Sequence, residues 1–531
     1  MKQKILSRLM GMAALMVMAA GVSAANPFLP LWEYIPDGEP YVFEDPDKPG
    51  AYRVYVYGSH DMLLSEYCGR DQVVWSAPVD DLKSWRFDGV IFESKLDRDG
   101  NPLHADGRGD VLYAPDVALR VMPDGSKRYY LYPNNQEGGR KTMVAVSDRP
   151  DGPFRVVNWS KEDAKQTDGV LDFDPAVFVD DDGRVYGYWG FERSYAAEFD
   201  PETMASVKPG CEIVEDLVPG YKQDETFRFF EASSMRKIQG KYVFVYSRWT
   251  REGEFGLGST NYTLAYAWSD NPLGPFTYGG TIIDGRGRET APDGTVRLTA
   301  HPGGNTHGSI VEINGQWYVF YHRQCGTDEY SRQAMVAPIR VEVTDSGVKI
   351  SEGEYTSEGF ETGGLDPFES HPAGIACHYT GPQPARQSYP NFLFSGSYPQ
   401  PVRESHYGSP DPYAEETNRS PLVNNTDGSV AGYKYFDFSR THGKQGLTLQ
   451  LTVVPEGVEG TIDICIDSPD GEKVGSVTVP GTPSVREMRL EADVQALSGL
   501  TGKHALYLKF SGKEKGKPIC RLERLRFAAA D

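Results

Sequence analysis

The 531-residue sequence lacks closely spaced cysteines and, beyond its first 24 residues, lacks any apolar run long enough to cross a membrane. Its six cysteines are scattered, with no CxxC pair, so neither a cysteine zinc motif nor a dense disulfide framework is expected. Basic residues are also fewer than acidic ones: the sequence has 54 Lys and Arg and 75 Asp and Glu, which gives a net charge of −21. This charge argues against nucleic acid or an anionic membrane as a partner, but not against a neutral polysaccharide.

The first 24 residues have the three parts of a secretory signal peptide. Basic residues come first, an apolar core follows, and the small-residue pattern Val22-Ser23-Ala24 ends the segment. We expect cleavage after Ala24 and export of the mature chain to the periplasm or to the outside of the cell. No cysteine follows the apolar core, so a membrane anchor of the lipoprotein type is not expected.

Glycine (57), proline (37) and aromatic residues (12%) are abundant, which favours short strands joined by tight turns. Five stretches share one pattern, in which a polar lead residue precedes an apolar strand, a turn and an aromatic strand. The turns read DPDKPG, PDG, DDDG, QG and NG, and such sequences are typical of β-hairpins. The five lead residues are Asp37, Asp116, Asp174, Glu231 and His307.

The spacing of the lead residues predicts the architecture. Consecutive lead residues are 57 to 79 positions apart, which leaves room for four strands in each repeat. Five such units arranged radially form a five-bladed β-propeller, so we predict an all-β fold with a propeller over residues 25–350. Lead residues at the start of each innermost strand would project toward the central axis. Four carboxyl groups and a histidine there indicate catalysis or metal binding, because a structural core would be apolar.

The motifs around the lead residues occur in one order along the chain. They are IPDGEP at 35–40, YAPDV at 113–117, FDPAVFVDDDG at 173–183, FFEASSMRKIQGKY at 229–242 and NTHGSI at 305–310. Together they resemble the signatures of glycoside hydrolase family 43, the five-bladed propeller glycosidases, over roughly residues 26–345. The resemblance implies hydrolysis of a glycosidic bond in one inverting step, with one carboxyl group as acid and another as base.

Catalytic roles follow from this resemblance. It implies that Asp37 is the general base, that Glu231 is the general acid, and that Asp116 orients the acid and tunes its pKa. The local sequence agrees for two of them: Glu231 follows two phenylalanines, where desolvation favours the protonated form, and Asp37 lies in a polar stretch. Asp174 precedes a proline, and we interpret it as structural or as a distant wall of the pocket.

Substrate and metal contacts are predicted at five further positions. The resemblance places Arg332 at the non-reducing-end sugar, and His60 with Asp61 follows the first aromatic strand near the rim. Trp75 is either a stacking wall or a core residue between blades. His307 is a candidate ligand, directly or through water, of a calcium ion in the central channel; a polar core role and a substrate contact remain open alternatives.

The C-terminal third has a different composition. Residues 351–392 are rich in Gly, Pro and Ser and are predicted to be a connector. Residues 393–531 show alternating strands typical of a β-sandwich of the jelly-roll type, and they resemble family 6 carbohydrate-binding modules. Tyr433, Tyr435 and Phe438 are candidate sugar-binding aromatics, although the asparagine that such modules carry near the last strand is not evident, so a structural sandwich is an equal alternative.

The resemblance favours plant-type polysaccharides or oligosaccharides as substrates. We expect an exo-acting α-L-arabinofuranosidase, with a β-D-xylosidase as the first alternative, because the two sugars present similar hydroxyl geometry to one pocket. A galactofuranosidase or galactanase is a further alternative. A non-catalytic carbohydrate-binding propeller is the alternative from another class.

Overall fold

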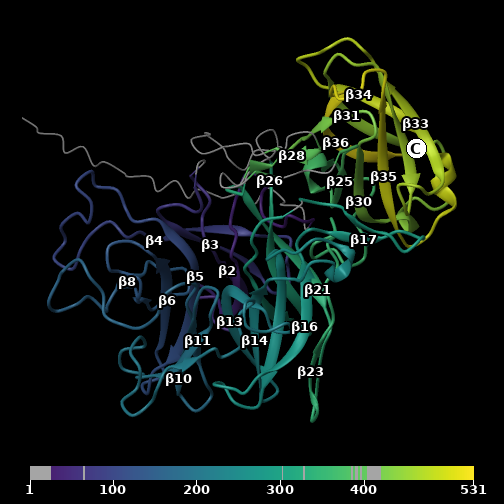
Figure 1. The fold of residues 1–531 in the computed structure, drawn as a ribbon. Helices are drawn as coiled ribbons and strands as arrows, with labels where there is room; N and C mark the ends of the chain where they lie inside the picture. Colours follow the sequence, from purple (N-terminus) through teal and green to yellow (C-terminus); the bar gives the residue numbers. More distant parts are fainter. Residues whose placement is uncertain are drawn as a thin grey trace, which may run out of the picture.

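The computed structural model describes residues 25–63, 66–301, 303–326, 329–383, 387–388, 393–394, 398–402 and 420–530. Two β-rich parts follow each other along the chain: a propeller, in purple to teal, and a sandwich, in green to yellow (Figure 1). The predicted signal peptide lies outside the described residues. Within these ranges, no helix has the length and apolar character needed to span a membrane.

The propeller consists of five antiparallel sheets whose strand order follows the chain. The first sheet contains β1 (Glu39–Glu44), β2 (Tyr52–Tyr57), β3 (Gln72–Pro78) and β4 (Arg86–Phe92); the second contains β5 (Leu112–Val121), β6 (Lys127–Asn135), β7 (Ala145–Ser147) and β8 (Arg155–Val156). The third contains β9 (Ala176–Val179), β10 (Val185–Trp189), β11 (Tyr195–Phe199) and β12 (Val214–Glu215); the fourth contains β13 (Phe229–Ile238), β14 (Lys241–Arg248), β15 (Thr263–Ser269) and β16 (Thr277–Asp284). The fifth contains β19 (Ser309–Ile313), β20 (Gln316–Gln324) and β21 (Arg332–Ile339).

The five predicted hairpins are the inner strand pairs of these sheets. β1 pairs with β2, β5 with β6, β9 with β10, β13 with β14 and β19 with β20. The turns have the backbone that their sequences predict: Gln239 and Gly240 have φ of 48° and 84°, and Asn314 and Gly315 have φ of 50° and 82°. Two successive positive φ angles define the type I′ turn, whose twist matches that of the strands it joins.

The inner strands form a closed ring. β1 contacts β5 and β19, while β9 contacts β5 and β13. The Ser234 and Ser309 hydroxyls, 2.7 Å apart, connect β13 to β19. Beside the outer edge of the fifth sheet lies Asn26, whose side-chain amide donates to the Val336 carbonyl at 2.6 Å and accepts from the Val336 amide at 3.0 Å. The first described residues thus cover this edge. The five sheets and the ring of contacts between their inner strands confirm the predicted five-bladed propeller.

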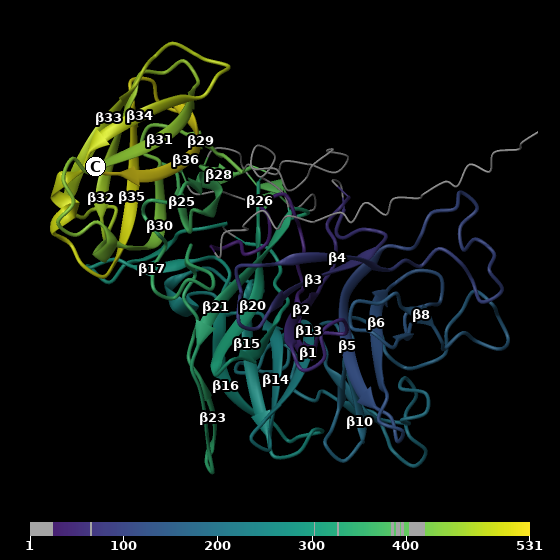
Figure 2. The ribbon, with the colours of Figure 1, turned by 180° about the vertical axis from the view of Figure 1, so that it is seen from behind.

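The C-terminal part is a β-sandwich, seen from behind in Figure 2. One sheet has the order β28 (Gln400–Pro401), β29 (Leu422–Asn425), β36 (Cys520–Ala528), β31 (Thr448–Pro455) and β34 (Met488–Asp493), with β24 (His371–Pro372) paired to β36. The other has the order β25 (His378–Thr380), β30 (Val430–Asp437), β35 (Lys503–Gly512), β32 (Gly460–Ile466) and β33 (Lys473–Val479). Both β24 and β25 lie within the predicted connector. They join the sandwich because their backbone groups pair with β36 and β30 and so complete the hydrogen bonding of these strands.

The sandwich packs firmly on the fifth blade. From β20, the buried Arg323 guanidinium donates to the carbonyl oxygens of Gly374 at 2.5 Å and Ala376 at 3.0 Å. Glu289, on the short strand β17 (Arg288–Thr290), forms an ion pair with Lys434 of β30 at 2.8 Å. A guanidinium or a carboxylate buried in a domain interface needs such partners to offset its desolvation, so these contacts fix the two domains together.

The three candidate sugar-binding aromatics of the sandwich are engaged elsewhere. Tyr433 and Phe438 are fully buried in the core that the two domains share. The Tyr435 hydroxyl donates to Glu354 Oε1 at 2.7 Å, just after the propeller. Tyr433 and Phe438 therefore expose no ring to a sugar, and Lys503 Nζ lies over the half-buried Tyr435 ring, 5.0 Å from its centroid.

Candidate active site

A cavity of about 710 Å³ opens at the centre of the propeller. Four of the five lead residues line it: Asp37, Asp174, Glu231 and His307. Aromatic side chains form much of the remaining wall, namely those of Tyr67, Tyr113, Phe173, Phe191, Phe230 and Trp249. The closed ring therefore brings residues from four blades together, as the repeat pattern predicts.

Local backbone irregularities aim the lead residues into the cavity. Asp37 and Asp174 have positive φ angles of 59° and 48°, and Glu231 lies where the β13 ladder shifts register on both sides. A bulge of this kind bends the strand and redirects one side chain. Gly308, after the lead histidine, must be a glycine, because a Cβ atom there would lie 1.9 Å from the Phe320 carbonyl oxygen. Non-glycine residues at positive φ cost conformational energy, which is a common feature of functional sites.

Asp37 is held as an anion. Arg332 Nη1 lies 3.1 and 3.2 Å from its two carboxylate oxygens, and the Ser59 hydroxyl donates to Oδ2 at 2.6 Å. Burial alone would raise the pKa of the Asp37 carboxyl, but the charge of Arg332 first, and then His322, His307 and the Ser59 hydrogen bond, outweigh burial and hold that pKa below its usual value. An ionised, oriented carboxylate is the form that a general base requires.

Glu231 has the opposite environment. It is buried, with Phe230 beside it packed edge-on against Phe191 and Trp249, whose ring centroids lie 5.0 and 4.8 Å away. Burial first, and the negative charge of Asp174 second, raise the pKa of Glu231 well above its usual value. No side chain or backbone group of the described residues forms a hydrogen bond with its carboxyl group, which leaves the proton available to a bound molecule.

Asp174 belongs to the wall of the cavity but lies near Glu231 and not at a distance from it, whereas Asp116 does not reach the cavity. Asp174 lines the cavity; its Oδ2 accepts from the Ala232 amide at 3.0 Å, one residue after Glu231, and burial raises its pKa to about 6. Asp116 is absent from the lining within the described residues. Its oxygens accept from the Tyr41 hydroxyl at 2.5 Å and the Val177 amide at 2.7 Å, so it connects the first three blades below the cavity. Among the carboxylates that line the cavity, Asp174 raises the pKa of Glu231 most, and Asp37 adds to this effect.

Arg332 lies at the cavity, as predicted, and Asp61 lies behind it. Arg332 Nε and Nη2 donate to the two Asp61 oxygens at 2.9 and 2.8 Å, which is a bidentate pair. Asp61 is fully buried and does not line the cavity, so it orients Arg332 instead of contacting a ligand. The Arg332 guanidinium also lies over the Tyr67 ring, 4.9 Å from its centroid.

His60 and Trp75 belong to the packed interior. Trp75 is fully buried between the fifth and first blades, and its indole nitrogen donates to Glu33 Oε2 at 2.8 Å. His60 contacts Asp71 at 2.7 Å and Glu33 at 3.2 Å. Neither residue lines the cavity, so neither can stack on or bind a ligand there. The structure agrees with the core alternative for Trp75, whereas the His60 ring contacts Glu33 and Asp71 instead of the rim of the cavity.

His307 faces two carboxylates at the axis. Its Nε2 lies 3.6 Å from Glu39 Oε1, and its Nδ1 lies 3.7 Å from Asp174 Oδ2. Burial lowers the pKa of His307, but these carboxylates outweigh burial and raise the pKa to about 9, which favours the imidazolium form. Its ring nitrogens and Glu39 Oε1 are buried and form no hydrogen bond within the described residues. The same atoms would suit the water shell of a hydrated cation if the ring lost its proton.

A separate group of side chains brings together atom types that bind metal ions. Among the described residues, His104, Asp110 and Glu137 bring suitable atoms within 4.8 Å of one another. Arg140 donates to both Asp110 oxygens at 2.7 Å, so a guanidinium already neutralises this carboxylate. We interpret the group as a structural ion-pair cluster.

Sequence reasoning missed His322 as a contributor to the site. Its Nδ1 accepts from the Asp37 amide at 3.1 Å and its Nε2 donates to the Asn305 carbonyl at 2.8 Å, which fixes one neutral tautomer. Burial lowers the pKa of His322 to about 3, in agreement with a neutral ring. The only sequence signal was a histidine at the end of an aromatic strand, in WYVFYHR, and that pattern is equally common in cores.

A carboxyl group with a lowered pKa and one with a raised pKa line one cavity, and these are the two elements that acid and base catalysis at a glycosidic bond requires. The comparison with known proteins agrees. Residues 42–345 match the family model described as glycosyl hydrolases family 43, and residues 404–529 match carbohydrate binding module (family 6). The chain belongs to glycoside hydrolase family 43 and is a glycoside hydrolase.

Three similar proteins illustrate the relationship. A xylosidase/arabinosidase of Thermoclostridium stercorarium is 33% identical over 92% of this chain and 96% of its own length. An arabinoxylan arabinofuranohydrolase of Paenibacillus polymyxa is 26% identical over 90% of this chain and 70% of its own length. A solved structure of a family 43 arabinoxylan arabinofuranohydrolase from Bacillus subtilis, in complex with cellotetraose, has a TM-score of 0.46 and 21% identity, covering 96% of this chain and all of that one.

Proposed function

We propose that this hydrolase removes α-L-arabinofuranosyl groups from plant-type polysaccharides or oligosaccharides, acting from the chain end and with inversion. The observation that carries the proposal is the pair formed by Asp37 and Glu231, whose pKa values move in opposite directions within one cavity. The names of the relatives support the sugar class, because both are described as acting on arabinosyl groups. β-D-Xyloside cleavage is the second candidate, supported by the double name of the first relative.

The proposed reaction uses two proton transfers. Glu231 gives its proton to the glycosidic oxygen as the bond from that oxygen to the anomeric carbon breaks. Asp37 takes a proton from water as the water oxygen attacks the same carbon from the opposite face. The products are a sugar of inverted configuration and a free hydroxyl group on the leaving chain. The carboxyl groups exchange their protonation states and reset through solvent.

We assign the tuning role to Asp174, in place of Asp116. A carboxylate beside Glu231 disfavours the ionised form of Glu231 and so keeps the acid protonated at higher pH. Asp174 lines the cavity and contributes that charge, whereas Asp116 lies outside the lining and its hydrogen bonds join blades. Arg332 then serves twice, because it keeps Asp37 ionised and presents its guanidinium at the cavity wall.

Calcium and export remain proposals. A hydrated calcium ion at the axis would use His307 and Glu39 and would supply a fixed positive charge in place of the imidazolium proton. Export is supported by the N-terminal pattern, and the mass of the secreted mature chain tests it. Cleavage after Ala24 would leave Ala25, which is fully buried beside the fifth blade, as the first residue.

A panel of nitrophenyl glycosides tests the activity. We expect the α-L-arabinofuranoside to be cleaved fastest and the β-D-xyloside more slowly, with little turnover of galactoside or galactofuranoside. A higher kcat/KM for the xyloside would make β-D-xyloside cleavage the main activity and arabinofuranoside cleavage the secondary one. Proton NMR of the first-formed sugar tests inversion, since a retained anomer would require a covalent intermediate.

A further inference from the structure

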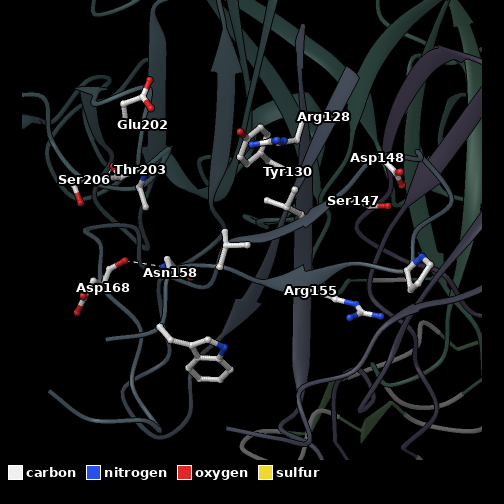
Figure 3. Close-up of a pocket in the computed structure, with 15 residues that line it drawn as sticks. Arg128, Tyr130, Ser147, Asp148, Arg155, Asn158, Asp168, Glu202, Thr203 and Ser206 are labelled. Atoms are coloured by element: carbon white, nitrogen blue, oxygen red, sulfur yellow. Dashed lines mark hydrogen bonds between the residues drawn. The ribbon is translucent and has the colours of Figure 1, made fainter. Parts of the chain in front are cut away.

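A second, larger cavity of about 860 Å³ lies on the side of the propeller, where the second and third blades meet. Strands β6 and β8, the segment after β8 and the turn after β11 enclose it. Figure 3 shows Glu202, Thr203, Ser206 and Asp168 along one side of this cavity, with Ser147 and Asp148 on the other. We refer to it as the side cavity.

The lining of the side cavity combines an apolar wall with many hydroxyl-binding groups. Trp159 is half-buried, Pro153 is exposed, and Val157 keeps 58% of its surface exposed, so solvent reaches this apolar wall. Polar partners surround this wall, namely Arg128, Arg155, Asp148, Asp168, Ser147, Thr203 and Ser206. An aromatic platform edged by short polar and charged side chains is the composition that binds a sugar ring, apolar on one face and rich in hydroxyls at its edge.

The platform is held rigidly before any ligand arrives. The Asn158 side chain donates to the carbonyl oxygens of Thr142 at 2.8 Å and Asp168 at 2.7 Å, and it accepts from the Val144 amide at 2.8 Å. Trp159 itself forms a β-bridge with Thr167. Because the backbone around the indole is fixed, ligand binding would cost little ordering entropy there.

Charge and burial define what the side cavity can do. Two guanidinium groups and the carboxylates of Asp148, Asp168 and Glu202 place both signs around it, so it has no strong field of one sign. All three carboxylates are exposed to solvent, unlike the buried pair at the axis. The cavity therefore lacks the desolvated acid that bond cleavage requires, and it suits binding of an uncharged molecule.

We propose that the side cavity is a second binding site for a neutral polysaccharide chain, stacked on Trp159 and separate from the catalytic cavity. This inference rests on the proposed function only in taking a plant-type polysaccharide as the ligand. A site of this kind would keep the enzyme on a polymer between turnovers, so its contribution would appear with long substrates and vanish with short ones.

The test uses Trp159→Ala in a Glu231→Gln background, so that no probe is hydrolysed. Affinity gel electrophoresis in neutral arabinoxylan should show retention weakened by about 5- to 10-fold, a loss typical of one removed stacking contact. Tyr52→Ala is the matched control, because Tyr52 is an exposed aromatic residue, 51% exposed, on the first blade. Its retention should equal that of the parent.

A second variant, Val157→Lys, separates a loss of binding from a loss of folding. Val157→Lys keeps the indole and places a charge on the apolar wall, and it should weaken retention in the same direction at an unchanged melting temperature. With Glu231 restored, both variants should cleave a nitrophenyl glycoside at the parent rate and arabinoxylan several-fold more slowly. Absence of nitrophenyl activity in the parent would refute the proposed function while leaving the retention result valid.

Three outcomes would overturn the inference. Equal retention of parent, Trp159→Ala and Val157→Lys would show that the side cavity does not bind the polymer. If the variants lost retention on acidic glucuronoxylan but not on neutral arabinoxylan, the ligand would be a uronate bound to Arg128 and Arg155 and not a neutral chain. A loss of nitrophenyl activity that equals the loss on polymer would show that the variants act on the catalytic cavity.

Discussion

Arg332 Nη1 lies 3.1 and 3.2 Å from the two carboxylate oxygens of Asp37, while the remainder of its guanidinium forms a bidentate pair with the buried Asp61. Arg332 thus connects the proposed general base, Asp37, to Asp61, a carboxylate that does not line the cavity. The arrangement fixes the orientation of Asp37 and stabilises its charged form. It also makes the acidic side of the pH profile dependent on a residue outside the reaction.

Replacement of Arg332 by glutamine should raise the pKa of Asp37. The arginine lowers that pKa in the folded protein, so its removal allows burial to dominate and the base to become protonated at higher pH. The acidic limb of kcat/KM against pH should therefore move to higher pH, and the rate should fall at neutral pH. Arg155→Gln, on the side cavity, is the control and should leave the limb in place. An unmoved limb in Arg332→Gln would contradict the coupling.

Asp174→Asn and Asp116→Asn should separate tuning from structure. The Asp174 charge raises the pKa of Glu231, so its loss lowers that pKa and moves the alkaline limb of the profile to lower pH. Asp116→Asn should leave the limb unchanged and reduce the melting temperature, because it weakens hydrogen bonds that join three blades. If the alkaline limb moved in Asp116→Asn alone, our reassignment of the tuning role would be incorrect.

Calcium bound at the axis should act through His307. Removal of divalent ions with a chelator, followed by calcium titration, measures the effect on melting temperature and on kcat/KM. We expect His307→Gln to lose any calcium response and to lower kcat/KM, since a positive charge at the axis would be missing in either case. A calcium response of equal size in His307→Gln would place the ion elsewhere.

The sandwich should be required for activity on small substrates as well as on polymers. The Tyr379 amide donates to the Thr299 carbonyl at 2.6 Å, and the Tyr379 hydroxyl accepts from the His301 amide at 3.2 Å. The loop that follows carries Asn305 and His307 into the catalytic cavity. Tyr379→Phe should cost about 1 kcal/mol of stability and lower nitrophenyl glycoside turnover. Unchanged turnover at a lowered melting temperature would limit the sandwich to a stabilising role.

The repeat pattern predicted the propeller well because hairpin turns and alternating strands are local features. QG and NG turns, for example, specify positive φ at both central residues wherever they occur. The same pattern predicted that Asp37, Glu231, Asp174 and His307 converge, since equivalent positions in a radial repeat must meet at the axis.

Relations between blades could not be predicted in this way. Whether Asp116 or Asp174 acts on Glu231 depends on bulges in β5 and β13, which a sequence pattern does not show. The burial of Trp75 and the docking of Tyr435 against Glu354 likewise depend on which neighbour packs on each strand. Strand residues such as these look alike in sequence whether they face a core, an interface or a ligand.

Glu231→Gln tests the central claim most directly. Glutamine has nearly the same shape but no proton to give, so turnover of arabinoxylan oligosaccharides should fall by about 10²- to 10⁴-fold, the range for loss of a general acid. Calorimetry with the same oligosaccharides should show binding retained, with the folded state unchanged. Equal release of arabinose by the variant and the parent would contradict the assignment of Glu231 as the proton donor and would favour a carbohydrate-binding propeller without catalysis at this site.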